Sequence, residues 1–165
     1  MDIPEIYSKF RHRIQGDVIS FGDVFFELFN ESDLEFEQEN SPLPAGVKLR
    51  DHEPYDPGKH LIIAAGPFNE PWFIDTADPD PQVKAALPAR KDHVELTVTC
   101  ISDSLEDLAS TIEYLQEAER EMKHRPDKEM LDVIFSRIKE INENADTGYW
   151  DVWLAEGEKW IERGN

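Results

Sequence analysis

Apolar residues are most concentrated between residues 61 and 75. Residues 61–66 are almost continuously apolar, which predicts a short strand that is buried on both faces. A turn containing Gly66, Pro67 and Asn69 follows, and residues 72–75 are aromatic and β-prone. The two runs predict a β-hairpin at the centre of an antiparallel sheet, with the rest of the chain packed around it.

Upstream of this hairpin, the apolar spacing predicts one helix and several short strands. Residues 18–29 fit either a strand or a helix, and their β-branched and aromatic side chains favour two strands separated by Gly22 and Asp23. Residues 34–37 alternate between apolar and acidic, which is typical of a strand with one solvent-exposed face. Residues 47–50 predict a further short strand. The apolar positions that place a helix over residues 3–14 are Ile3, Ile6, Tyr7, Phe10 and Ile14.

Downstream of the hairpin, one more strand precedes three helices. Residues 93–101 alternate cleanly, so Cys100 is expected to be a small core residue. Helical spacing then covers residues 103–122, 127–144 and 150–161, and the last two segments predict an αα-hairpin. Gly157 would let a neighbouring backbone approach the last helix closely. That helix also carries three tryptophans at helical spacing, which favours a core position: Trp150, Trp153 and Trp160.

The charge of the chain narrows the classes of partner. The 165 residues contain 36 Asp and Glu against 17 Lys and Arg, which gives a net charge of −19. Such a chain repels nucleic-acid phosphates and anionic lipid and favours a basic partner, so we expect neither a nucleic-acid nor a membrane interaction. The alternative is that the acidic residues serve only solubility, which explains the net charge equally well.

Composition also limits the class of protein. Hydrophobic residues make up 39% of the sequence, enough for the core of one domain, and the length leaves room for an appendage. The single cysteine excludes an intramolecular disulfide and a cysteine-based zinc cage. Residues 1–20 do not resemble a signal peptide, and the longest apolar run is far below the ~20 residues of a membrane helix. We therefore expect a cytoplasmic protein.

Few residues are candidates for catalysis. Asp75, Asp78 and Asp80 follow the second strand of the hairpin, and aspartates in a proline-broken loop usually cap backbone N–H groups. The alternative is a metal-dependent hydrolase that uses the Asp75–Asp80 loop with a distant histidine. No nucleophile, zinc or phosphate-binding motif is present, so we expect no enzyme activity and no cofactor.

Two short segments resemble the SUKH superfamily, also called the SMI1/KNR4-like family. They are Glu70-Pro71-Trp72-Phe73-Ile74-Asp75, on the second strand of the hairpin, and Asp103-Ser104-Leu105-Glu106-Asp107-Leu108, at a helix start. The resemblance covers about residues 18–116. It departs from the family pattern where residues 68–71 replace a Gly-Gly-Asp-type turn, and where the N-terminal helical region is shorter.

The resemblance implies a fold and a function. The fold would be α+β, a mostly antiparallel twisted sheet with helices packed on it, to which this chain adds the C-terminal helical hairpin. Residues 1–116 would form the SMI1/KNR4-like domain, and residues 117–165 a helical extension packed on the same globule. Bacterial members of the family resemble immunity proteins that bind and neutralise a cognate toxin, often a nuclease, without catalysis.

Three functional hypotheses follow. The first is a toxin-neutralising protein-binding module, in which Trp72 serves as an anchor if it is exposed. The second is the hydrolase described above, and the third is a scaffold that self-associates through the helix containing Trp150 and Trp160. The oligomeric state is left open. The residues expected to contact a basic protein partner in the first hypothesis are Glu31, Asp33, Glu35, Glu37, Trp72, Asp75, Asp78 and Asp80.

Overall fold

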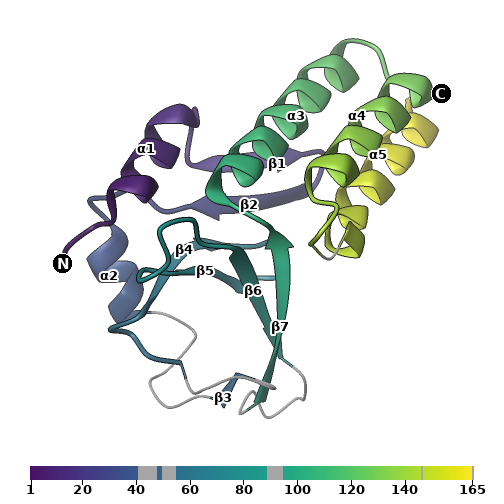
Figure 1. Ribbon diagram of the computed structural model, residues 1–165. Helices are drawn as coiled ribbons and strands as arrows, with labels where there is room; N and C mark the ends of the chain where they lie inside the picture. Colours follow the sequence, from purple (N-terminus) through teal and green to yellow (C-terminus); the bar gives the residue numbers. More distant parts are fainter. Residues whose placement is uncertain (41–47, 50–54, 89–94, 146, 165) are drawn as a thin grey trace.

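The computed structural model describes residues 1–40, 48–49, 55–88, 95–145 and 147–164 (Figure 1). Within these residues, the chain has the expected α+β class, with one sheet and a C-terminal helical pair. The strands are β1 (Val18–Phe21), β2 (Val24–Leu28), β3 (Lys48–Leu49), β4 (His60–Ala65), β5 (Pro71–Asp75), β6 (Val83–Pro88) and β7 (Glu95–Ser102). The helices are α1 (Glu5–Arg13), α2 (Leu34–Glu39), α3 (Leu105–His124), α4 (Lys128–Ile141), the 3₁₀ turn η1 (Thr147–Trp150) and α5 (Asp151–Arg163).

The described strands form one sheet in the order β1-β2-β4-β5-β6-β7-β3. Neighbouring strands are antiparallel, except that β3 runs parallel to β7. β4 and β5 form the predicted hairpin at the centre of this order, with Leu61 paired to Ile74. The residues of β4 from Leu61 to Ala64 are buried, which confirms the prediction of a strand covered on both faces.

Four helices cover one side of the sheet. α3 packs across β1, α5 packs on β1 and β2, α1 packs on α3, and α4 lies between α3 and α5 (Figure 1). The Ser104 hydroxyl caps α3 by accepting a hydrogen bond from the Asp107 amide at 3.0 Å, as the sequence predicts. α3 continues through residues 116 and 117, so the expected domain boundary falls inside a helix.

Trp150 of η1 and Trp153 of α5 belong to the same core as the hairpin. The rings of Trp72 and Trp150 are 6.0 Å apart, and those of Phe26 and Trp153 are 5.9 Å apart. All four side chains are buried, whereas Trp160 is half-buried. Trp150 and Trp153 therefore offer no surface for self-association. The hypothesis of a scaffold that self-associates through the helix containing Trp150 and Trp160 stays a prediction.

The prediction of a strand over residues 34–37 is wrong, because these residues form part of helix α2. Leu34 is fully buried, whereas Phe36 is 64% exposed, so burial does not follow the alternation of a strand. The carbonyl of Asn30 accepts hydrogen bonds from the amides of Asp33 and Leu34, which begins a helical turn. Leu, Glu and Gln are good helix formers, and acidic residues in the first turn favour a helix N-terminus.

Gly157 and Cys100 have surroundings different from those expected. A Cβ atom at Gly157 would lie 2.6 Å from Leu131 Cδ1, so it is a side chain rather than a backbone that approaches this glycine. Cys100 is only half-buried, and Ile101 is the fully buried residue beside it. Burial raises the pKa of the Cys100 thiol, which opposes formation of a reactive thiolate.

Candidate functional site

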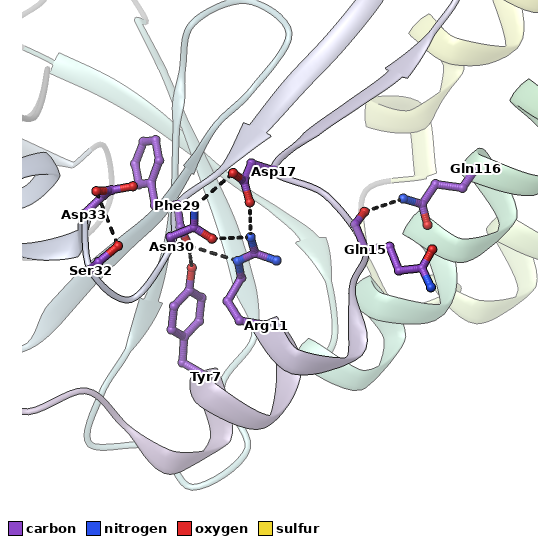
Figure 2. A network of polar contacts seen from close by, with 9 residues as sticks. All are labelled: Tyr7, Arg11, Gln15, Asp17, Phe29, Asn30, Ser32, Asp33 and Gln116. Carbon is purple, nitrogen blue, oxygen red and sulfur yellow. Dashed lines mark hydrogen bonds and ion pairs between the residues drawn. The ribbon is translucent and has the colours of Figure 1, made fainter.

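The site begins where the chain leaves β2 and turns into α2. Figure 2 shows Arg11 of α1 reaching this turn, where its guanidinium group contacts three residues. Arg11 Nε donates to the Phe29 carbonyl at 3.1 Å, and a terminal nitrogen donates to Asp17 Oδ1 and Asn30 Oδ1, both at 2.7 Å. The Tyr7 hydroxyl also donates to the Phe29 carbonyl. These buried and part-buried contacts hold the turn between β2 and α2 against α1.

Gln38 attaches α2 to the edge of β4. Its Nε2 donates to the Ile62 carbonyl at 2.8 Å, and its Oε1 accepts from the Ile62 amide, also at 2.8 Å. β2 pairs with β4 only at Ala64 and Ala65, so it ends before reaching Ile62. The amide group of Gln38 therefore takes the place of a strand neighbour at that point and sets α2 beside β4.

A cavity of about 280 Å³ lies between the end of β2, α2, β4 and the turn that joins β4 to β5. Its floor includes the buried apolar residues Phe29, Ile62 and Ala64. Two carboxylates and two carboxamides complete the lining with Ala65 and Pro71: Glu27, Glu37, Asn40 and Asn69. The cavity thus joins an apolar floor to a polar, acidic wall.

The two carboxylates of this cavity repel each other. Burial raises the pKa of the Glu37 carboxyl above its usual value, and the negative charges of Glu27 and Asp33 raise that pKa further. No lysine, arginine or histidine is among the described residues that line the cavity. A cation entering the cavity would relieve this repulsion.

Exposed apolar side chains lie on the elements that line the cavity and on β1, the strand next to β2. On β2, Phe26 and Leu28 are buried, so the alternating residues Phe25 and Glu27 lie on the opposite face, where Phe25 is 58% exposed. Val18 of β1 pairs with Glu27 and is also exposed. Phe36 on α2 and Phe68 in the β4–β5 turn are exposed as well. We call these four apolar residues and the cavity between them the α2 face: Val18, Phe25, Phe36 and Phe68.

The acidic residues predicted around α2 do lie together on this helix and its entry turn. Asp33 and Glu35 are exposed, whereas Glu31 and Glu37 are half-buried. The Oε1 atom of Glu31 is buried and has no hydrogen-bond partner in the described part of the protein. Of these four residues, Glu37 is the one that lines the cavity.

The prediction that Trp72 could anchor a partner is wrong. Trp72 is fully buried, and its Nε1 donates to the Tyr149 hydroxyl at 2.8 Å. That hydroxyl donates to the buried carboxylate of Glu70, which also accepts from the Phe68 amide at 2.7 Å. A Cβ atom at Gly66 would lie 2.2 Å from Glu70 Oε1, so this buried carboxylate needs glycine there. The segment that carries the family resemblance is therefore structural at Glu70 and Trp72.

Asp75, Asp78 and Asp80 form a separate group. Asp75 pairs with His60 at the end of the β4–β5 hairpin opposite to Ala65 and Pro71, which line the cavity. Asp75 Oδ1 accepts from the Ala77 amide and Asp78 Oδ1 from the Asp80 amide, both at 2.9 Å. These are the turn-capping contacts expected of aspartates in such a loop.

The first aspartate of this loop also forms an ion pair. The Asp75 carboxylate lies 3.5 Å from Lys59 Nζ. Across the described segments there is no group of three or more His, Cys, Asp or Glu side chains that could hold a metal ion.

None of the helices in those segments is long and apolar enough to cross a lipid bilayer.

Several polar residues of the site were not predicted from the sequence, namely Glu27, Gln38, Asn40 and Asn69. The signal for Glu27 was available, because Phe25 and Glu27 alternate with the apolar residues Phe26 and Leu28 along a strand. No local pattern marks Gln38, since its role depends on contact with Ile62, 24 residues away.

Comparison with known proteins adds no further assignment. No protein-family model matches the chain, and neither curated proteins nor solved structures give a match.

Proposed function

We propose that this protein is a non-catalytic, cytoplasmic protein-binding module that neutralises a basic toxin domain, and that the α2 face is its binding surface. The observation that carries the proposal is the cavity in which Glu27 and Glu37 repel each other over an apolar floor. A fold gains nothing in stability from two such carboxylates, whereas a basic partner would bind to them.

Two further observations support the proposal. The net charge of −19 would attract a basic protein over a long range and speed its association. A nuclease is such a partner, because an active site that attracts phosphate also attracts carboxylates. The resemblance to the SMI1/KNR4-like family, whose bacterial members resemble immunity proteins, favours the same class of function.

Exposed aromatic side chains fit a protein surface as partner better than a small basic molecule. Phe25, Phe36 and Phe68 are each more than half exposed and belong to three different elements around the cavity. Exposed apolar patches beside polar groups mark protein–protein interaction sites, and aromatic side chains are enriched at such interfaces. The surface offered to a partner thus combines apolar contact area with uncompensated acidic groups.

The test is capture followed by reconstitution. The immobilised protein is incubated with lysate of the source cell at low and high salt, and each retained protein is purified and examined for toxicity on expression. We expect a basic protein that is retained at low salt, is toxic when expressed alone, and is harmless when co-expressed with this chain. Retained proteins that are neither basic nor toxic, or a toxin that co-expression does not neutralise, would contradict the proposal.

A matched pair of variants tests the binding surface. One variant replaces Glu27, Glu35 and Glu37 by Gln, and the control replaces three exposed acids of α4 and α5 in the same way: Glu140, Glu158 and Glu162. α2 and the α4–α5 pair lie at opposite sides of the molecule in Figure 1, and both variants lose the same net charge. Only the first variant should lose protection against the toxin, since equal losses would indicate a general effect of charge.

A further inference from the structure

The cavity on the α2 face has the form of a receptor for one long side chain. Its floor is apolar, with Phe29, Ile62 and Ala64 buried beneath it, and its volume is about 280 Å³. Glu27 from β2 and Glu37 from α2 supply carboxylates from two different elements. The carboxamides of Asn40 and Asn69 add oxygens that can accept hydrogen bonds from a donor.

Lysine and arginine match this lining. Each carries a flexible apolar stem that gains from contact with apolar surface, and a cationic head that donates several hydrogen bonds. The stem would lie on the floor of the cavity, and the head would lie between the carboxylates of Glu27 and Glu37. A bare metal ion would leave the apolar floor without contacts, and an apolar side chain would leave both carboxylates without a counter-charge.

The surroundings of the cavity also suit an anchoring side chain. Phe25 and Val18 are exposed on the sheet face that carries Glu27, while Phe36 and Phe68 are exposed on α2 and on the β4–β5 turn. Apolar contacts around a central buried group exclude water and so strengthen the contact at the centre. A partner that packs on these aromatic rings would bring one of its side chains into the cavity.

We propose that the cavity between β2, α2 and the β4–β5 turn receives a single lysine or arginine side chain of the basic protein partner, and that Glu27 and Glu37 select for it. This inference rests on the proposed function, because it identifies what that partner presents to the α2 face. It places the specificity of binding in two carboxylates rather than in the total acidity of the chain.

The experiment is a titration of the ¹⁵N-labelled full chain, monitored by two-dimensional NMR. The probes are Nα-acetyl-arginine amide and Nα-acetyl-lysine amide, and the uncharged comparisons are Nα-acetyl-citrulline amide and Nα-acetyl-norleucine amide. We expect shifts at the amides of Glu27, Glu37, Ala65 and Asn69 with the charged probes alone. Equal shifts with citrulline amide, or shifts spread over all acidic segments, would overturn the inference.

Variants and two further cations distinguish binding in the cavity from a general effect of negative charge. Replacing both Glu27 and Glu37 by Gln should weaken binding of the charged probes about tenfold or more. Replacing Glu158 and Glu162, two exposed acids of α5, by Gln removes the same charge and should leave the affinity unchanged. Unchanged backbone shifts far from the cavity would show that the double variant is folded. Magnesium chloride and methylammonium should not reproduce the shifts, because neither has an apolar stem, and reproduction by either would overturn the inference.

The outcomes also distinguish this inference from the proposed function. If the toxin binds and is neutralised while the arginine and lysine probes do not reach the cavity, the inference fails and the proposed function stands. If the probes bind at the cavity but no toxin is neutralised, the proposed function fails and the cavity is a receptor for basic side chains in another setting.

Discussion

The hydroxyl of Tyr149 donates a hydrogen bond to the carboxylate of Glu70, and both residues are buried. Glu70 lies in the turn of the β4–β5 hairpin, and Tyr149 lies in η1, immediately before α5. The indole of Trp72 donates to the same hydroxyl at 2.8 Å. Burial raises the pKa of Tyr149 far above its ordinary value, so this hydroxyl keeps its proton and remains a donor. The contact attaches the C-terminal helices to the central hairpin.

The substitution Tyr149→Phe should destabilise the fold by about 2 kcal/mol, because Glu70 Oε1 and the indole N–H of Trp72 each lose the hydrogen bond to this hydroxyl while they stay buried. Equilibrium urea unfolding would measure the change. Tyr114→Phe, at a half-buried position on α3, is the matched control and should change the stability much less. Equal losses in the two variants would show that the Tyr149 hydroxyl has no special role.

Much of this fold follows from periodicity in the sequence. β4 and β5 are short, apolar and separated by a Gly/Pro turn, and α3 and α4 repeat their apolar positions at helical spacing. These segments are predicted correctly because each is buried along most of one face. α2 has only six residues and a single buried one, Leu34, so its pattern is too short to distinguish a helix from a strand.

The candidate site was predictable only in part. The concentration of acidic residues around Glu37 is visible in the sequence and does lie on one element. The cavity itself depends on contacts between distant segments, above all the bonds from Gln38 to Ile62 and from Arg11 to Phe29. The burial of Trp72 could not be predicted from its neighbours in the sequence either, because its ring packs against the distant rings of Phe26, Tyr149 and Trp150.

Gln38→Met tests whether one side chain holds α2 against the sheet. Methionine keeps the length of the side chain but leaves the Ile62 amide and carbonyl without their partner, so we expect a loss of about 1–3 kcal/mol. Amide hydrogen exchange at Ile62 should accelerate more than exchange elsewhere in β4. Gln116→Met is the control, because the Gln116 side chain also donates to a backbone carbonyl, that of Gln15, but this hydrogen bond is exposed. Unchanged exchange at Ile62 would contradict this role of Gln38.

Gly157→Ala tests the packing of α5 against α4. Alanine is the better helix former by about 1 kcal/mol, so a helix free of contacts would become more stable. Here the added Cβ would lie 2.6 Å from Leu131 Cδ1 and 3.0 Å from Phe21 Cε1. We therefore expect a net loss of about 1–3 kcal/mol from overpacking.

A double-mutant cycle separates crowding from other effects at Gly157. In the Leu131→Ala background, Gly157→Ala should lower the free energy of unfolding less than it does in the natural chain, or raise it. The reason is that the Leu131 methyl groups that meet the new Cβ are then absent. Thermal or urea unfolding of the four proteins gives the coupling between the two positions. If the stability losses of the two single variants add up to that of the double variant, Leu131 does not limit the space at Gly157.

Glu37→Gln tests the electrostatic state of the cavity through the pH dependence of stability. Burial and the charges of Glu27 and Asp33 raise the pKa of Glu37 in the folded protein above the unfolded value of about 4.3. Below that value, the carboxyl is protonated in both states and carries no penalty. As the pH rises through the folded pKa, the folded protein must hold an unfavourable charge, so this residue lowers the stability at neutral pH.

Glutamine has the size of glutamate but no charge, so Glu37→Gln should be more stable than the natural chain near pH 7. The advantage should disappear as the pH falls below about 4, and urea midpoints measured across this range would detect it. Glu35→Gln, at an exposed position of the same helix, should change the midpoints less. Parallel curves for Glu37→Gln and the natural chain would show that Glu37 carries no penalty. A gain in stability combined with loss of binding to arginine amide would mean that the carboxylate is kept for recognition at a cost to the fold.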